Sequence, residues 1–440
     1  MKSKTDFLIL NAILVTMDKD LRIINRGAIA ISGSHILAIG SQENILTQYD
    51  SDNNIDAGGG MVMPGLINTH THLAMVLLRG LAEDLELPVW LKKVWKAEHA
   101  VMTPDTVELG ARLGIIESIM SGTTCAVDMY WYPDRTAWAA QSLGFRLANG
   151  PVFLDSTSAP DGLAFMDRCS LTRDFIAEFQ TDPLIIPMIM PHSTATDSPA
   201  FLKQVKSLAD RYGVMLNMHC AETEGEVKTV INQYGKPPVS LLESIGLLDN
   251  PIILAHCVHV TKQEILTLAK KRVLVAHNPV SNMKLASGIT PVFEMLQAGV
   301  NVSLGTDGAQ SSNDLNMWLP IRLTALLQKV QHFNASVITA QEVIKMATID
   351  AATGIGLGNQ IGSLEAGKIA DLIVIKNNTP HMVPMFDPYA QLVYSAGRDD
   401  VNHVMINGKW VMFSRKLITG NLQDCLDKVS NFAKDIEKFS

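Results

Sequence analysis

Eight short apolar stretches repeat along the middle of the chain, and most of them end on a histidine or an aspartate. The predicted strands cover Met61–Asn68, Thr123–Val127, Phe145–Ala148, Leu184–Met190, Val214–Met218, Ile252–Ala255, Val273–Ala276 and Val300–Leu304. Helical patterns between them include Asp105–Met120, Ser198–Tyr212, Pro238–Ile245 and Lys262–Lys270. Strands that alternate with helices favour a parallel sheet, and eight such units close into a (β/α)8, TIM-like barrel. The polar strand ends therefore indicate an active site at the carboxyl ends of the barrel strands.

The two ends of the chain have a different pattern, with strands and turns in place of alternating strands and helices. Strand-like stretches cover residues 7–16, 22–31 and 34–39, then Asp371–Ile375, Val404–Ile406 and Lys409–Met412, and an amphipathic helix is predicted over Leu422–Phe439. We predict that residues 1–60 and 371–440 pair into a small composite β-sandwich domain. The catalytic barrel then covers residues 61–370.

The amino-acid composition argues against nucleic acids and membranes as partners. The 440 residues are 47% hydrophobic, carry a formal net charge of −8, and show no block of Lys or Arg, so we expect no nucleic-acid partner. We expect no membrane partner either, because no uncharged apolar run reaches the ~18 residues of a spanning helix. The five cysteines are odd in number, widely spaced and without a CxxC pair, which favours the reducing cytoplasm.

His70 and His72 follow the first predicted strand with one residue between them. Alternate residues of a strand point to the same face, so both imidazoles can reach one metal ion. Two histidines at this spacing are a weak signal alone. The signal is strengthened by His219 and Asp307, which stand at the ends of the fifth and eighth predicted strands. Taken singly, His219 has a simpler interpretation as a core histidine and Asp307 as a turn residue.

Three histidines and one carboxylate are donors that suit zinc or iron. They leave a coordination position for water, whose pKa the metal lowers towards ~7, and this indicates a hydrolase. Glu222 lies three residues beyond His219 and is the candidate proton carrier, although an acidic residue is also favoured in the first turn of any helix. His256, at the end of the sixth strand, is placed to stabilise the developing charge.

Six segments together resemble the amidohydrolase superfamily, and within it the branch of 5-methylthioadenosine/S-adenosylhomocysteine deaminases and their chlorohydrolase relatives. They are Pro64–His72, His219–Thr223, Ala255–His259, His277–Leu285, Leu304–Gly308 and Ile361–Asp371. The resemblance covers nearly the whole chain. It implies one divalent metal ion, zinc with iron as the alternative, and hydrolytic deamination at C6 of an adenine ring, a reaction at a C–N bond of a cyclic amidine.

The resemblance also implies roles for individual residues. Glu222 protonates the ring nitrogen with assistance from His256, while Asp307 binds the metal and takes a proton. Glu98 binds the ribose hydroxyls and His192 contacts the purine. Trp90 and the cluster Tyr130, Trp131 and Tyr132 are expected to line the pocket, although aromatic residues more often pack in a core. Without the resemblance, Glu98 would be interpreted as a solvated helix residue.

The chain departs from the branch in one respect. Deaminases that act on S-adenosylhomocysteine can hold its carboxylate with arginines after the third strand, but residues 149–166 contain none, and the nearest are Arg146 and Arg168. We therefore predict 5-methylthioadenosine as the substrate, ahead of S-adenosylhomocysteine or adenosine. The alternatives are a hydrolase of another heterocycle (a triazine, guanine or a pterin) and, more remotely, a non-catalytic binding scaffold. We also expect a homo-oligomer.

Overall fold

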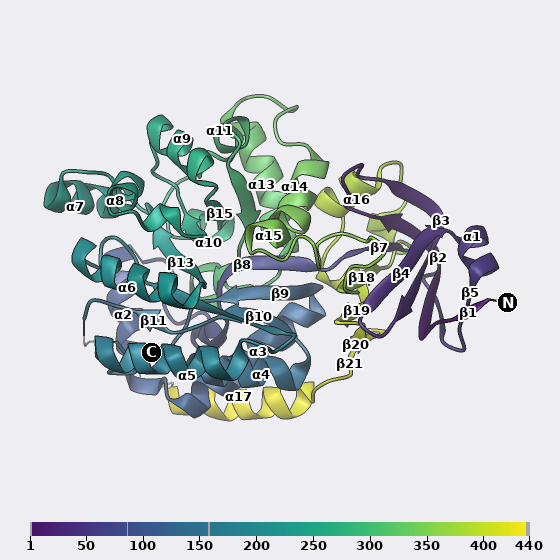
Figure 1. Ribbon diagram of the computed structural model, residues 1–440, viewed down its shortest axis with the longest axis horizontal. Helices are drawn as coiled ribbons and strands as arrows, with labels where there is room; N and C mark the ends of the chain where they lie inside the picture. Colours follow the sequence, from purple (N-terminus) through teal and green to yellow (C-terminus); the bar gives the residue numbers. More distant parts are fainter. Residues whose placement is uncertain (1, 86, 157–158, 437–440) are drawn as a thin grey trace.

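The computed structural model describes residues 2–85, 87–156 and 159–436 (Figure 1). A parallel sheet forms its centre, and its strands follow one another in sequence order. They are β8 (Leu66–His72), β9 (Thr123–Asp128), β10 (Arg146–Asn149), β12 (Ile185–Pro191), β13 (Met215–Cys220), β14 (Ile252–His256), β15 (Leu274–His277) and β16 (Asn301–Leu304). Two residues after β16, the short β17 (Asp307–Gly308) pairs with β8, so the strand order returns to its start, consistent with a TIM-like barrel.

Helices surround this sheet (Figure 1). They include α3 (Pro104–Met120), α4 (Pro133–Leu143), α5 (Phe165–Phe179), α6 (Pro199–Tyr212), α7 (Glu224–Tyr234), α8 (Pro238–Ser244), α9 (Lys262–Lys271), α10 (Pro279–Lys284), α11 (Val292–Gln297), α13 (Trp318–Gln331), α14 (Ala340–Met346) and α15 (Ile349–Gly354). Side-chain caps begin several of them: Thr103, Ser198 and Thr261 each accept a hydrogen bond from a backbone N–H of the first turn. The four predicted helices are confirmed.

The two chain ends meet in one mainly antiparallel sheet beside the parallel one (Figure 1). Its strand order is β21 (Lys416–Leu417), β20 (Lys409–Phe413), β19 (Val401–Ile406), β18 (Leu372–Ile375), β7 (Met61–Pro64), β2 (Phe7–Val15), β3 (Ile23–Ser32) and β4 (His35–Ser41), with β6 (Asn54–Asp56) beside β2. Strands from both chain ends thus lie in one sheet, since β18 and β2 both pair with β7, and the predicted β-sandwich domain stays a prediction. We name this sheet the terminal sheet.

One predicted strand is wrong in its extent. The stretch Met61–Asn68 divides at Gly65, so that β7 joins the terminal sheet between β18 and β2 while β8 begins the parallel sheet. A Cβ atom at Gly65 would lie 2.1 Å from Thr124 Oγ1, so only glycine allows the chain to pass this close to β9. β8 then runs on through His72, which places both histidines on the strand itself.

A buried ion pair joins the two sheets at the amino ends of the parallel strands. Arg146 opens β10, and its Nε lies 2.7 Å from Oδ2 of Asp371, the residue before β18. Arg146 also donates to the carbonyl of Pro183, and Asp371 Oδ1 accepts from the backbone N–H of Asn407. Both charges are therefore paired and hydrogen-bonded, as burial requires.

The last helix, α17 (Leu422–Ile436), returns to the barrel and packs against α3 (Figure 1). The predicted helix Leu422–Phe439 is confirmed up to Ile436, and its remainder lies outside the described residues. All five cysteines are described and free. Among the helices of the described residues, none is both long and apolar enough to cross a bilayer.

Candidate metal and catalytic site

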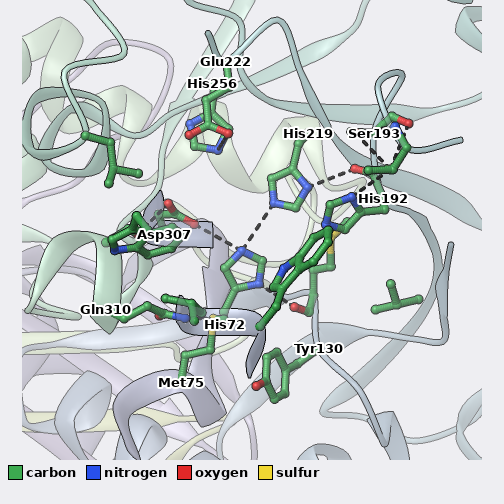
Figure 2. A pocket seen from close by; sticks show the side chains of 18 of the residues that line it. His72, Met75, Tyr130, His192, Ser193, His219, Glu222, His256, Asp307 and Gln310 are labelled. Atoms are coloured by element: carbon green, nitrogen blue, oxygen red, sulfur yellow. Dashed lines mark hydrogen bonds and ion pairs between the residues drawn. The ribbon is translucent and has the colours of Figure 1, made fainter. Parts of the chain in front are cut away.

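The four predicted metal ligands converge at the carboxyl ends of the parallel strands. His72 Nε2 lies 3.2 Å from Asp307 Oδ1 and 3.3 Å from His219 Nε2, and His70 Nε2 lies 3.4 Å from the same oxygen of Asp307. Figure 2 shows the ring of His72 between Asp307 and His219. The residues come from β8, β13 and β17, which bring together positions more than two hundred residues apart in the chain.

The cluster fits a metal ion. Donor atoms of His70, His72 and His219 all lie within 4.8 Å of one another, and so do those of His70, His256 and Asp307. His70 is fully buried, and neither of its ring nitrogens has a hydrogen-bond partner among the described residues. A buried polar atom without a partner costs free energy unless something binds it. Histidine nitrogen and carboxylate oxygen are the donors that a divalent transition metal prefers.

Backbone carbonyls orient two of the histidines. His72 Nδ1 donates to the carbonyl of Met129 at 2.5 Å, and His219 Nδ1 donates to the carbonyl of His192 at 2.9 Å. In both rings Nε2 is then the free nitrogen and faces the cluster. Ligand histidines in metal sites are commonly held in this way.

Two hydroxyls orient Asp307. Its Oδ2 accepts hydrogen bonds from Ser281 at 2.6 Å and from Ser311 at 2.7 Å, which leaves Oδ1 facing the histidines. Burial by itself would raise the pKa of Asp307, but its contacts with His70 and His72 hold that pKa well below the usual range. The carboxyl group is therefore ionised at neutral pH. The sequence carried no signal for the two serines.

Glu222 and His256 face each other across the cluster, with Glu222 Oε2 4.0 Å from His256 Nε2. Burial raises the pKa of Glu222, with His256 opposing and Asp307 adding to the rise. His256 Nδ1 donates to Oδ1 of Asn282 at 2.8 Å, so Nε2 is the ring nitrogen directed at Glu222. A carboxyl group that is protonated more readily than usual is suited to carrying a proton.

A cavity of about 330 Å³ opens beside this cluster, and Figure 2 shows His192, Glu222 and Asp307 among its lining residues. Glu98 and Trp90 line it as well. Glu98, on α2 (Leu87–Val101), is only 3% exposed, which excludes the solvated position that its residue type suggests. Its Oε1 accepts a hydrogen bond from the Tyr130 hydroxyl at 2.7 Å. Burial raises the pKa of Glu98 to about 7, with Tyr130 and the charge of His72 acting in the opposite direction.

The other predicted pocket residues differ in how they are held. His192 is anchored through Nδ1, 2.9 Å from the Thr196 hydroxyl. Trp90 is 7% exposed, and its Nε1 has no hydrogen-bond partner among the described residues. Tyr130 and Trp131 line the cavity, whereas Tyr132 is not among its lining residues. Apolar walls that the sequence did not indicate come from Met75, Val94, Trp95, Met129 and Leu285.

The described residues that line the cavity include no lysine or arginine. Both arginines that flank residues 149–166 have an acidic partner. Arg146 pairs with Asp371 at the opposite ends of the strands. Arg168 lies behind the cavity wall, with its guanidinium 5.5 Å from the ring centre of Trp131, and forms two hydrogen bonds, of 2.6 and 2.8 Å, with Asp161. The cavity is therefore aromatic and acidic in character.

Residues 61–411 match the amidohydrolase family, and the chain belongs to that family. A 5-methylthioadenosine/S-adenosylhomocysteine deaminase of Syntrophobacter fumaroxidans is 40% identical over 435 residues, which are 99% of each chain. A 5'-deoxyadenosine deaminase of Methanosarcina acetivorans is 40% identical over 98% of each chain. The crystal structure of a zinc-bound adenosine deaminase from Xanthomonas campestris superimposes with a TM-score of 0.95 at 33% identity and covers 100% of both chains. The resemblance in the six sequence segments is confirmed.

Proposed function

We propose that this protein is a metal-dependent hydrolytic deaminase that converts a 5'-modified adenosine, with 5-methylthioadenosine favoured, to the inosine analogue and ammonia. One observation carries the proposal. The histidine–aspartate cluster and the Glu222–His256 pair open into one aromatic cavity that also holds the buried carboxyl group of Glu98. The names of the two relatives that are 40% identical support the same substrate class.

One divalent metal ion belongs to this site, held by His70, His72, His219 and Asp307. We propose zinc rather than iron, because the structural relative with TM-score 0.95 contains zinc. When bound, the metal would supply the Lewis acidity that makes water a nucleophile at neutral pH.

The protein side chains move the protons. Asp307 accepts a proton from the attacking water, and His256 Nε2 stabilises the charge that develops on the oxygen. Glu222 delivers a proton to the ring nitrogen beside C6 as the water oxygen bonds to C6. Asp307 then passes the proton that it took from the water to the C6 amino group, the C6–N bond breaks, and ammonia leaves. The proton of the remaining hydroxyl returns to Glu222, which gives the inosine analogue. The 4.0 Å between Glu222 and His256 allows both to contact the same reacting group.

Substrate binding involves the other side of the cavity. The Glu98 carboxylate accepts hydrogen bonds from the ribose hydroxyls, His192 contacts the purine, and Trp90 forms part of the wall. A 5'-methylthio group suits apolar and aromatic surroundings. The carboxylate of S-adenosylhomocysteine would meet no free arginine or lysine among the described lining residues. We therefore propose a preference for 5-methylthioadenosine.

A substrate panel tests the proposal. Purified, zinc-loaded protein is incubated with 5-methylthioadenosine, 5'-deoxyadenosine, adenosine, S-adenosylhomocysteine, guanine, a triazine and a pterin. Release of ammonia and the adenosine-to-inosine absorbance change are followed. We expect the highest kcat/KM with 5-methylthioadenosine. Turnover confined to guanine, the triazine or the pterin would replace the proposal, and absence of both bound metal and turnover would favour a binding scaffold.

The organisation of the chain is proposed on the same basis. The terminal sheet supports a separate small β-sandwich domain of residues 1–60 and 371–440 beside a barrel of residues 61–370, with β7 as a shared border strand. We further propose a cytoplasmic homo-oligomer that acts on a small purine nucleoside. The free state of all five cysteines is compatible with a reducing compartment.

A further inference from the structure

Glu226, in the first turn of α7, binds the backbone of the residue four positions before it. Its Oε2 accepts a hydrogen bond of 2.7 Å from the backbone N–H of Glu222, and its Oε1 accepts one of 3.2 Å from the N–H of Ala221. One carboxylate thus holds two consecutive peptide groups, and hydrogen bonds to an ionised acceptor are stronger than neutral ones. The pair of bonds fixes both the position and the orientation of this peptide segment.

The peptide segment that Glu226 binds has an unfavourable backbone conformation, which needs hydrogen bonds to hold it. Ala221 has a φ of +51°, in the left-handed region that is unfavourable for a residue with a Cβ atom. On its other side, the carbonyl of Ala221 accepts from the backbone N–H groups of Val258 and His259, both at 3.0 Å. The turn directs Glu222 towards His256, and Glu226 provides the contacts on the side of α7.

Glu226 is itself held in place. Its backbone N–H donates to the hydroxyl of the N-cap residue Thr223 at 3.1 Å. The hydroxyl of Thr194 donates to Glu226 Oε1 at 3.3 Å, and Thr194 lies two residues after His192. The carboxylate therefore connects the turn that carries the proton carrier with the loop that carries a purine-contacting residue.

We propose that Glu226 is a positioning residue that sets the geometry of Glu222 for proton transfer. Both of its oxygens accept backbone hydrogen bonds, so it acts through the turn although it lines the cavity. The inference rests on the proposed function in one respect, the assignment of Glu222 as the proton carrier. The geometry of the turn is independent of that assignment.

Two substitutions of Glu226 should lower kcat to different extents. In Glu226→Gln one oxygen still accepts, but the amide nitrogen opposes the second backbone N–H, and Glu226→Ala removes both bonds. We expect kcat to fall in the order wild type, Gln, Ala, by ~10- to 100-fold for Ala, because small misplacements of a catalytic group have effects of this size. KM should change by less than about 3-fold, and the metal content should stay the same, since no ligand is removed.

Glu224→Gln is the matched control. Glu224 lies in the same helical turn, but it is exposed and forms a surface ion pair with Lys228. Its substitution should leave kcat within about 2-fold of the wild type, since exposed pairs of this kind contribute little. A fall in kcat as large as that of Glu226→Gln would mean that the charge of the turn matters, and would overturn the positioning role.

A double-mutant cycle separates positioning from general loss of structure. If Glu226 acts through Glu222, then Glu226→Ala should lower kcat by less than about 3-fold in a Glu222→Gln background, because the group being positioned is already absent. A full, multiplicative loss in that background would overturn the proposal. The comparison uses the full-length, metal-loaded protein throughout.

Hydrogen exchange tests the turn without any assay of activity. Followed by mass spectrometry, the peptide containing residues 220–223 should exchange faster in Glu226→Ala than in the wild type or in Glu224→Gln. Unchanged exchange would overturn the hydrogen-bonded clamp, whatever the substrate proves to be. Faster exchange together with a wild type that deaminates no nucleoside would instead leave the clamp standing and refute the proposed function.

Discussion

The two ends of the parallel strands bury charged groups in opposite ways. At the amino ends, Arg146 and Asp371 neutralise each other, and backbone groups satisfy their remaining hydrogen bonds. At the carboxyl ends, the ring nitrogens of His70 have no hydrogen-bond partner among the described residues, and burial raises the pKa of both Glu222 and Glu98, which no lysine or arginine of the described cavity lining neutralises. Charges that are paired and hydrogen-bonded can be buried at little net cost, whereas buried groups without such partners are available to a metal, a proton or a substrate.

The backbone at the carboxyl ends of the strands includes several strained residues. Ala221, His256, Cys257 and Asp307 all have positive φ, at 51°, 73°, 47° and 61°, and all lie at the carboxyl ends of the strands. Non-glycine residues in this region are strained, and such strain persists only where the surroundings hold it in place. The contacts around these four residues therefore hold the backbone at the carboxyl ends in strained conformations.

The largest loss of activity is expected from His70→Ala. This change removes a ligand whose ring nitrogens have no hydrogen-bond partner among the described residues, so bound metal should fall well below one equivalent per chain. The value of kcat/KM should drop by ~10³-fold or more, since the metal contributes several kcal/mol to catalysis. Elemental analysis and the deamination assay measure both. His35→Ala, at an exposed histidine of the terminal sheet, is the control and should retain metal and activity. A metal-replete His70→Ala protein would contradict the ligand set.

Glu222→Gln is expected to have the next largest effect. It should lower kcat by ~10²-fold or more, because a general acid–base group contributes on that scale, while metal content stays near that of the wild type. Elemental analysis alongside steady-state kinetics distinguishes this result from loss of metal. Near-normal turnover in Glu222→Gln would assign the proton transfer to another group.

The effect of pH on KM should be smaller than the effect of either substitution on kcat. The pKa of Glu98 is raised to about 7, so the carboxylate that accepts from the ribose is present above this pH and lost as the pH falls through it. KM for 5-methylthioadenosine should therefore rise as the pH drops below about 7. Tyr130→Phe removes a hydrogen bond that lowers this pKa, so the rise should begin at a higher pH.

The control for this profile is Glu98→Gln, which should have a higher KM at every pH and no rise of this kind. Initial rates measured across pH 5.5–8.5, roughly the range that brackets the shifted carboxyl group, give both quantities. A wild-type KM that is flat across the range would show that Glu98 does not bind substrate as a carboxylate.

The smallest effect on catalysis is expected from Arg146→Met. It leaves the Asp371 carboxylate buried without its cation, which should lower the free energy of unfolding by ~3–5 kcal/mol. The kcat of the folded protein should nevertheless change by less than about 2-fold, because the pair lies at the far ends of the strands. Denaturant unfolding measures the free energy of unfolding, and steady-state kinetics measure kcat. Arg146→Met with Asp371→Asn should recover part of the stability, since no unpaired charge remains.

The sequence was sufficient to predict the convergence of His70, His72, His219 and Asp307. Parallel strands that follow one another must bring their carboxyl ends to one side, so polar residues at those ends meet regardless of their distance along the chain. The pairing of the chain ends was also predictable, from strand patterns with no helices between them. The place of Glu98 in the pocket could be predicted only from the resemblance, because a single glutamate in a helix gives no sign that it is buried.

Other features depend on contacts between segments that no local pattern records. Asn282, which holds His256, and the serines that hold Asp307 come from α10 and α12 (Ala309–Ser312), whose positions are set only when the barrel is complete. The division at Gly65 results from the close approach of Thr124, a residue of the neighbouring strand. The apolar pattern of Met61–Asn68 predicts one strand, but this long-range contact divides the stretch into β7 and β8.

The place of β18 between β7 and β19 has a consequence for synthesis of the chain. β7 ends at Pro64, whereas β18 begins at Leu372, so one edge of β7 has no partner until every barrel strand has left the ribosome. At roughly 5–20 residues per second, the wait is about 15–60 s. During translation the first metal-binding strand is therefore joined to an unfinished sheet edge, the kind of edge on which chains aggregate. The terminal sheet is completed last, after the strands that carry the site.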